Sequence, residues 1–286
     1  MMNWLSSGAL LSDGAWGTEM QRRGLAAGEV PDAWNLSNPG QVEDVARAYV
    51  EAGSQVILTN TFRSNRISLA GTGLSGRVAE LNRAGVRASR QAAAGRALVF
   101  ASIGPSGKML MAGEVTEDGL LAAFEEQAAA QAEAGADALL VETMSDIAEA
   151  RQALVAARKT GLPVVVSFVF DTGKNKDRTM MGQTPEQAAK AMAEEGAAAV
   201  GANCGAGIER FAPICRRLKE ACALPVWIKA NAGLPELRDG QVCYPSSPDE
   251  FAGHVPALLE AGAGVVGGCC GTTPDFIRAV AKVLGR

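Results

Sequence analysis

Three cysteines stand where strands are expected to end, and their residue type suits a soft metal ion. Cys269 and Cys270 are adjacent within the glycine-rich tract 265–274, and Cys204 lies well upstream. Adjacent cysteines between glycines are poorly suited to core packing, whereas thiolates are good zinc ligands. Zinc takes four ligands in tetrahedral array, and a catalytic site usually keeps one position open. The three cysteines therefore predict one zinc ion per chain with a vacant fourth position.

The ligand set also predicts a type of chemistry. Zinc with three thiolates carries a net negative charge, so it generates hydroxide from water poorly and suits a thiol substrate. A substrate thiol with an ordinary pKa of roughly 8.5 would lose its proton on binding. We expect the resulting thiolate to attack an activated methyl group. No catalytic group is expected beyond this zinc-activated thiolate.

Two acidic residues, Asp13 and Glu142, end other strand candidates and are expected on the same rim. An amino-acid substrate has an ammonium group that carboxylates bind and a carboxylate that free backbone N–H groups bind. We expect Asp13 and Glu142 to hold the ammonium group. The turn at Gly14 and Ala15 is expected to bind the carboxylate.

The remaining cysteines and the single histidine narrow the chemistry. Cys215 and Cys222 fit buried, inert thiols, and the role of Cys243 stays open. His254 is the one histidine in the chain, which excludes histidine-based metal sites and Ser/His/Asp triads.

Apolar runs and helix-length segments alternate along the chain. Strands are predicted at 9–13, 56–60, 98–103, 138–142, 164–168, 199–203, 226–229 and 264–267. Helices are predicted at 42–52, 75–94, 120–134, 147–160, 185–195, 208–221, 248–260 and 274–283. Eight such pairs predict an α/β fold, a single (β/α)8 TIM barrel occupying residues 1–286 as one domain.

Capping residues support this division into elements. Three helices are expected to begin at hydroxyl N-caps, namely Thr184, Ser247 and Thr273. Four are expected to end at left-handed glycines, namely Gly53, Gly135, Gly196 and Gly262. The two long connections, 171–183 and 235–248, follow strands, so they are expected at the C-terminal face as donor-recognition loops or as ordinary solvated loops.

Composition excludes several classes of protein. The formal charge is −4, without a long basic run, which argues against nucleic acid or an anionic membrane as partner. The longest apolar stretch, 162–170, is interrupted by Pro163 and Ser167, so no membrane span or export signal is expected. Six irregularly spaced cysteines favour a reducing cytoplasm over a secreted disulfide framework.

Seven motifs are similar to those of the homocysteine S-methyltransferase family, and they span nearly the whole chain. They are 13–18, 59–62, 102–105, 141–143, 201–204, 230–235 and 267–271. The resemblance implies a zinc-bearing barrel that binds L-homocysteine through Cys204, Cys269 and Cys270. It implies that Asp13 and Glu142 bind the amino group, that Asn203 is among the substrate-binding residues, and that methionine is the product.

The methyl donor varies within that family, and two positions bear on it. Arg63 and Thr143 stand where betaine-dependent members have tyrosines, and a quaternary ammonium needs aromatic faces. The opening motif and 59–62 look closer to cobalamin-dependent methionine synthase. We therefore expect a separate methylcorrinoid protein as donor, with cobalamin on that partner alone. A direct donor, betaine or S-methylmethionine, is the alternative.

Two further alternatives belong to other classes. Lys229, at the end of the seventh strand candidate, could serve a Schiff-base aldolase. The adjacent Cys269 and Cys270 could instead form a redox or structural zinc element in a non-catalytic scaffold.

Overall fold

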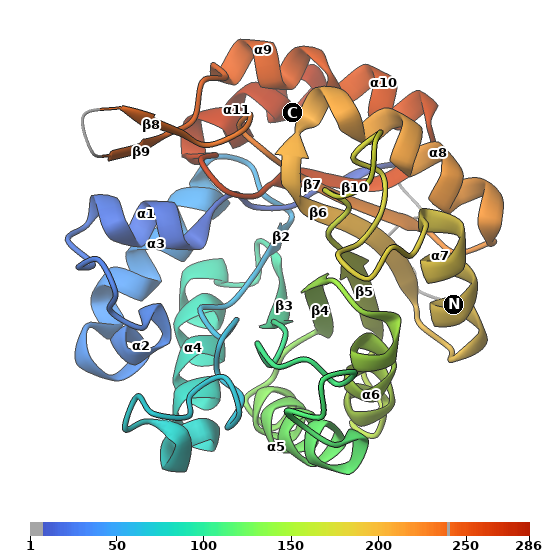
Figure 1. Cartoon of the computed structure of the whole chain (residues 1–286). Helices are drawn as coiled ribbons and strands as arrows, with labels where there is room; N and C mark the ends of the chain where they lie inside the picture. Colours follow the sequence, from blue (N-terminus) through green and yellow to red (C-terminus); the bar gives the residue numbers. More distant parts are fainter. Residues whose placement is uncertain (1–7, 239–240) are drawn as a thin grey trace.

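The computed structural model describes residues 8–238 and 241–286, and its centre is a parallel eight-stranded sheet (Figure 1). The strands pair in the order β1-β10-β7-β6-β5-β4-β3-β2. Their bounds are β1 (Leu10–Leu11), β2 (Val56–Ile57), β3 (Leu98–Ile103), β4 (Ala138–Met144), β5 (Val164–Phe168), β6 (Ala199–Gly207), β7 (Val226–Asn231) and β10 (Ala263–Gly268). A parallel bridge between Ser12 and Val56 joins the two ends of this order. The sheet therefore forms the predicted barrel.

Helices surround the barrel and bury its outer face (Figure 1). They are α1 (Trp16–Arg22), α2 (Trp34–Ser37), α3 (Pro39–Glu51), α4 (Val78–Ala93), α5 (Glu117–Glu133), α6 (Ile147–Arg158), α7 (Pro185–Glu194), α8 (Phe211–Ala221), α9 (Pro248–Gly253), α10 (Val255–Glu260) and α11 (Pro274–Val283). Short 3-10 helices occupy Pro31–Ala33, Ser75–Arg77 and Ile208–Arg210. None of the helices in the described part of the chain has the length and hydropathy to cross a lipid bilayer.

The barrel interior is filled below the C-terminal rim. A separate cluster of buried side chains from alternating strand positions occupies it, and the rings of Phe100 and Trp227 stack there with centroids 5.6 Å apart. Inward side chains of a parallel barrel form such packed layers. Open space for a ligand is therefore left above this cluster of side chains, at the carboxyl ends of the strands.

The helix caps and glycine terminators are confirmed. Thr184 and Ser247 each form a reciprocal capping box, and the Thr273 hydroxyl accepts from the N–H of Asp275. The four glycines that were expected to end helices, Gly53, Gly135, Gly196 and Gly262, all have positive φ. These local signals therefore placed element boundaries correctly.

Several regions differ from the predicted elements by more than a shift of their ends. The helix expected over 248–260 is two helices, α9 and α10, because Pro256 lacks an N–H and its ring clashes with the carbonyl four residues back. The connection 235–248 contains an antiparallel hairpin of β8 (Glu236–Arg238) and β9 (Gln241–Cys243). Helix α1 has no range among the predicted helices, although the glycine turn in 13–18 is expected to lead into a helix.

Candidate functional site

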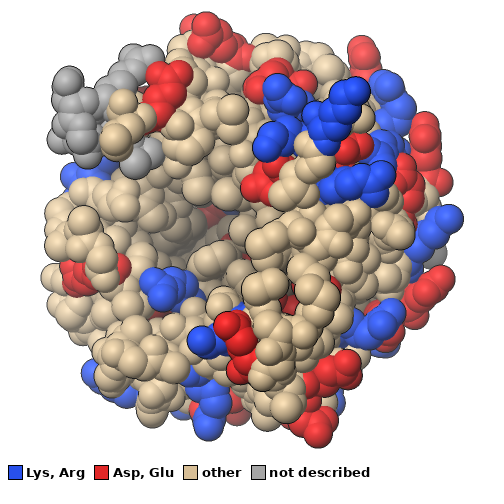
Figure 2. Space-filling view, in the orientation of Figure 1, with Lys and Arg blue, Asp and Glu red and all other residues tan. Residues whose placement is uncertain are grey.

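A cavity of about 410 Å³ opens at the C-terminal end of the barrel. Figure 2 shows this face of the molecule hollowed near its centre. The wall includes strand ends from β4, β6, β7 and β10 and the start of α1, and its residues include Glu142, Thr143, Cys204, Lys229, Cys269 and Cys270. The volume lies in the range typical of small-molecule sites.

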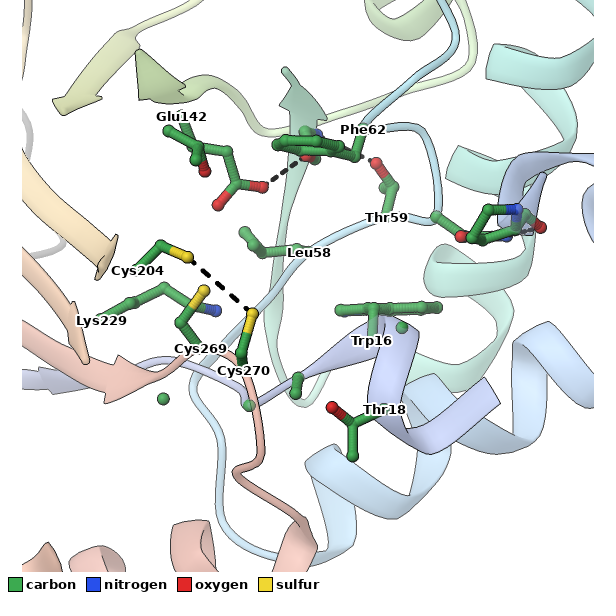
Figure 3. Close-up of a pocket in the computed structure, with 18 of the residues that line it drawn as sticks. Trp16, Thr18, Leu58, Thr59, Phe62, Glu142, Cys204, Lys229, Cys269 and Cys270 are labelled. Carbon is green, nitrogen blue, oxygen red and sulfur yellow. Dashed lines mark hydrogen bonds between the residues drawn. The ribbon is translucent and has the colours of Figure 1, made fainter. Parts of the chain in front are cut away.

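The structure brings the three expected cysteines together at one end of this cavity. The Sγ atoms of Cys204, Cys269 and Cys270 all lie within 4.8 Å of one another, and those of Cys204 and Cys270 are 3.9 Å apart (Figure 3). Tetrahedral zinc with Zn–S bonds of about 2.3 Å requires sulfur atoms about 3.8 Å apart. All three side chains are half-buried, so one side of the cluster faces the cavity. Both the donor atoms and their spacing fit a zinc ion.

Hydrogen bonds within the cluster favour the thiolate form of Cys204. The thiols of Cys269 and Cys270 donate to the sulfur of Cys204 and lower the pKa of Cys204 to about 3. The hydrogen bond to Cys204 in turn raises the pKa of Cys270 to about 11, and burial of the thiol adds to this shift. One thiolate is therefore already stable at neutral pH, as an incoming cation requires.

The backbone at this rim is irregular in the two places where it presents functional side chains. The register of β4 shifts between Val141 and Met144, and that of β6 shifts between Asn203 and Gly207. Bulges of this kind redirect side chains beside active sites. They also explain why β4 and β6 run beyond the predicted ends, since the regular pattern stops at the bulge.

Glu142 lines the cavity beside the sulfur cluster. Its carboxyl group is buried and accepts a hydrogen bond from the Ser102 hydroxyl (Figure 3). Burial raises the pKa of Glu142 to about 7, although the positive charge of Lys229 opposes this shift. A buried carboxyl group with few donors retains the capacity to bind a cationic ligand group.

The surroundings of Asp13, the other carboxyl group that is expected to bind the ammonium group, differ from those of Glu142. It is fully buried and is absent from the cavity wall. Its carboxylate forms an ion pair with the Lys229 ammonium. It also accepts hydrogen bonds from the indole N–H of Trp16 at 2.7 Å, the backbone N–H of Leu58 at 2.7 Å and the Ser12 hydroxyl at 3.2 Å. The Asp13 carboxylate therefore has four donors within the protein itself.

Gly14 and Ala15 do line the cavity, as expected for the turn that would bind the substrate carboxylate. The Ala15 N–H, however, donates to the carbonyl oxygen of Thr272 at 3.0 Å. Trp16, Gly17 and Thr18 follow on the same wall and form the first turn of α1, where no side chain caps the helix. The N–H groups of this turn are therefore better placed than the Ala15 N–H to donate hydrogen bonds to an anion.

Asn203 is fully buried, and it too is absent from the cavity wall. Its side-chain amide is hydrogen-bonded to Thr143 and Ser167.

The cavity is also lined by aromatic side chains from the motifs 13–18 and 59–62 and by Asp32, which the sequence patterns did not single out. Trp16 and Phe62 lie in the wall (Figure 3), and Asp32 and Arg63 belong to the same wall. One oxygen of the buried Asp32 carboxyl group accepts from the N–H of Arg63 at 3.0 Å and from the hydroxyl of Ser64. Burial raises the pKa of Asp32 to about 6. The motif 59–62 indicated this loop, but nothing near Asp32 in the sequence predicted that its side chain would lie at the cavity.

The other cysteines and His254 are not among the residues that line the cavity. Cys215 is buried against the carbonyl oxygen of Ala261, and burial raises its pKa to about 12, which fits an inert thiol. Cys222 and Cys243 are half-buried. His254 is exposed at the junction of α9 and α10.

Comparisons with known proteins give one family. A model of the homocysteine S-methyltransferase family matches residues 10–284. Methionine synthase of Mycobacterium leprae is 30% identical over 303 aligned residues, which cover 100% of this chain and 25% of that protein. Methionine synthase of Mycobacterium tuberculosis matches to the same extent. The chain thus spans about a quarter of the length of the curated relatives it matches.

Solved structures support the fold. The metallated form of the homocysteine methyltransferase MmuM from Escherichia coli has a TM-score of 0.81 and 24% identity, covering 96% of each chain. Pyruvate carboxylase from Rhizobium etli, at 15% identity, has a TM-score of 0.57 over 98% of this chain and 28% of that one. Such likenesses show a shared barrel and leave activity to the site residues.

Proposed function

The chain belongs to the homocysteine S-methyltransferase family, and from this premise we propose that it methylates homocysteine to methionine with the help of one zinc ion. The observation that supports this most directly is the convergence of Cys204, Cys269 and Cys270 on one wall of the cavity. We assign these three residues as the zinc ligands. Zinc bound there would act as a Lewis acid that lowers the pKa of the acceptor thiol and keeps it a nucleophilic thiolate.

The remaining wall residues would orient the acceptor. The Glu142 carboxylate would bind the ammonium group of homocysteine, next to the sulfur end of the cavity. The substrate carboxylate would lie at the turn formed by Gly14, Ala15 and the first residues of α1. Asp13 would act indirectly, because its ion pair holds Lys229 at the cavity wall.

The transfer is a nucleophilic displacement. The thiol proton leaves to solvent, and the homocysteine sulfur forms a bond to the methyl carbon with its electron pair. The bond between that carbon and the donor breaks, and the donor departs with the bonding electrons. The chain's contribution is to hold the sulfur and the methyl group in line and to exclude water from between them.

We favour a methylcorrinoid on a separate protein or module as the donor. Exposed apolar side chains lie on the connections that follow β3, β5 and β7, at the same end of the barrel as the cavity mouth. They are Met109, Met111, Met180, Leu234 and Leu237. Exposed apolar surface around a site is typical of a protein partner, and methionine is common on adaptable binding surfaces. The cobalamin would belong to that partner.

A small cationic donor is the second candidate, favoured by a different observation. Trp16 and Phe62 line the cavity and Asp32 adds a buried carboxyl group to the same wall. Aromatic faces and a carboxylate suit a sulfonium or quaternary ammonium group. This arrangement partly offsets the lack of tyrosine at Arg63 and Thr143, on which the expectation against betaine rested.

Metal analysis and a donor panel test the proposal. Protein purified anaerobically without chelators should contain one zinc per chain, and a Cys204→Ser variant should lose both zinc and methionine formation by at least about 100-fold. The panel pairs homocysteine with methylcobalamin, S-methylmethionine or betaine. Full zinc in the Cys204→Ser protein, or no methionine from any donor, would contradict the proposal.

The panel and a variant also separate the two donors. If the donor is cationic, Asp32→Asn should raise the donor KM while leaving the homocysteine KM unchanged. Asparagine keeps the acceptor oxygen that the Arg63 N–H and Ser64 hydroxyl use, so the loop stays in place. A neutral corrinoid donor should not respond to this change.

A further inference from the structure

The side chain of Asn203 connects three strands at the rim of the barrel. Its Oδ1 atom accepts from the backbone N–H of Thr143 at 2.9 Å and from the Ser167 hydroxyl at 2.6 Å. Its Nδ2 atom donates to Oγ1 of Thr143 at 2.7 Å. Because β5 lies between β4 and β6 in the sheet, this side chain reaches across a whole strand. Thr143 is therefore held at both its backbone and its side chain by one residue of β6.

Thr143 and Cys204 both adopt a backbone conformation that is unfavourable for their residue types. Their φ angles are +62° and +60°, in the left-handed region. This region costs about 1–2 kcal/mol for a residue with a Cβ, and a β-branched threonine there is a true outlier. Such a conformation persists only when neighbouring bonds hold it. Asn203 supplies two such bonds to Thr143 and directly precedes Cys204.

The two strained residues adjoin the two ends of the candidate site. Glu142 directly precedes Thr143, and Cys204 is one of the three clustered thiols. The bulges in β4 and β6 fall at the same places, so the rest of the sheet ladder does not fix these residues. Among the described residues, Asn203 links the two, because it is hydrogen-bonded to Thr143 and directly precedes Cys204 in the chain.

We propose that Asn203 is a positioning residue that sets the distance between the ammonium-binding end and the sulfur-binding end of the acceptor site. The inference rests on the proposed function for the identity of the acceptor. Asn203 acts through Thr143 and Cys204 and does not touch the substrate. This role differs from the substrate-binding role that the sequence indicated. It also explains why the backbone of Thr143 is held in the left-handed conformation.

A purely structural Asn203 would have other consequences. Buried polar residues often stabilise a barrel layer, and their loss lowers the free energy of unfolding. In that case a folded variant would bind metal and acceptor as the wild type does. A positioning role predicts instead that both affinities fall in protein that remains folded.

The experiment measures binding rather than turnover. Asn203→Ala should lower Zn²⁺ affinity, followed by chelator competition, about 10-fold, as is typical for groups that orient metal ligands. It should lower homocysteine affinity of the zinc-loaded protein, followed by calorimetry, by a similar factor. Ser167→Ala is the matched control, because it removes a bond to the same Oδ1 atom without touching Thr143; we expect less than about a threefold change.

A rescue variant makes the test specific. Glycine adopts positive φ freely, so adding Thr143→Gly to Asn203→Ala should restore homocysteine affinity about fivefold relative to Asn203→Ala alone. If Asn203→Ala does not fold, Thr143→Val replaces it. Valine keeps the N–H bond and loses the hydroxyl, and it should weaken homocysteine binding about threefold.

The outcomes separate this inference from the proposed function. Wild-type affinities in folded Asn203→Ala, or a double variant that binds no better than Asn203→Ala, would overturn the positioning role. In the valine arm, unchanged homocysteine affinity in folded Thr143→Val would do the same. If the wild-type protein itself failed to bind homocysteine, the proposed function would fall. The zinc measurement would still decide whether Asn203 positions Cys204.

Discussion

Two buried carboxyl groups at the barrel rim, Asp13 and Glu142, have opposite surroundings. Asp13 forms an ion pair with Lys229 and accepts three further hydrogen bonds. Glu142 accepts one side-chain hydrogen bond from Ser102 and faces the cavity. Similar positions at strand ends therefore have different surroundings, and under the proposed function the carboxylate with all its partners supports structure, whereas the one with few partners binds a ligand.

The largest effect should come from removing the charge of Asp13. Asp13→Asn leaves the Lys229 ammonium buried without its main partner, which costs about 3–5 kcal/mol of unfolding free energy. Urea unfolding of the zinc-free protein measures this. Glu142→Gln serves as the matched comparison and should change the same quantity by less than about 1 kcal/mol. If both variants lost the same free energy of unfolding, Asp13 and Glu142 would not differ in their contribution to stability.

Glu142→Gln should show the reverse pattern in binding. Loss of a charge-assisted bond to the substrate ammonium should weaken homocysteine binding about 30-fold, or about 2 kcal/mol. Zinc content should stay at the wild-type level, because Glu142 is separate from the cysteine cluster. Calorimetry with homocysteine and with 3-mercaptopropionate, which lacks the amino group, isolates the effect. If the variant weakened both ligands equally, Glu142 would not be the ammonium site.

The raised pKa of Glu142 predicts how homocysteine affinity depends on pH. The pKa of Glu142 is raised to about 7, so the carboxylate that binds an ammonium forms as pH rises through about 7. Homocysteine affinity should increase over that interval, more steeply in wild type than in Glu142→Gln. For stability the sign is opposite: a raised carboxyl pKa favours the folded state below the ordinary value of 4.5, and this contribution is lost as pH rises to about 7.

The negative charge of Asp13 contributes to the raised pKa of Glu142. In Asp13→Asn protein that remains folded, the midpoint of the homocysteine pH profile should therefore move to lower pH. An upward movement would show that Asp13 acts on Glu142 through some other route.

The smallest effect is expected at Ser102. Ser102→Ala removes the hydroxyl that donates to Glu142, and this bond lowers the pKa of that carboxyl group. We expect about a threefold weaker binding of homocysteine at pH 7 and a higher pH midpoint. A pH titration of binding detects both, and an unchanged midpoint would mean that the bond has little influence on Glu142.

Much of the fold could be predicted because its signals are local. The strands 98–103 and 164–168 and the helix 274–283 have the predicted bounds, since apolar runs and capping residues mark them directly. Convergence of the cysteines followed from barrel geometry, which places all strand ends on one rim. The bounds of helix α1 could not be predicted, because its first turn overlaps the motif 13–18.

The parts that could not be predicted depend on contacts between distant segments. Asp13 and Lys229 are 216 residues apart, and nothing near either one indicates the ion pair. Lys229 was instead considered as a Schiff-base nucleophile. The same holds for Asn203, whose partner Thr143 lies 60 residues away and one strand beyond its neighbour in the sheet.

The position of Trp16 gives the molecule a built-in optical probe. Its indole N–H is bonded to Asp13 while its ring lines the cavity, whereas Trp34 and Trp227 are buried in the core and Trp4 lies outside the described residues. A ligand that enters the cavity changes the polarity around this ring and therefore its fluorescence emission. Occupancy of the unlabelled protein can thus be followed in real time, and the order in which acceptor and donor arrive becomes measurable by stopped-flow.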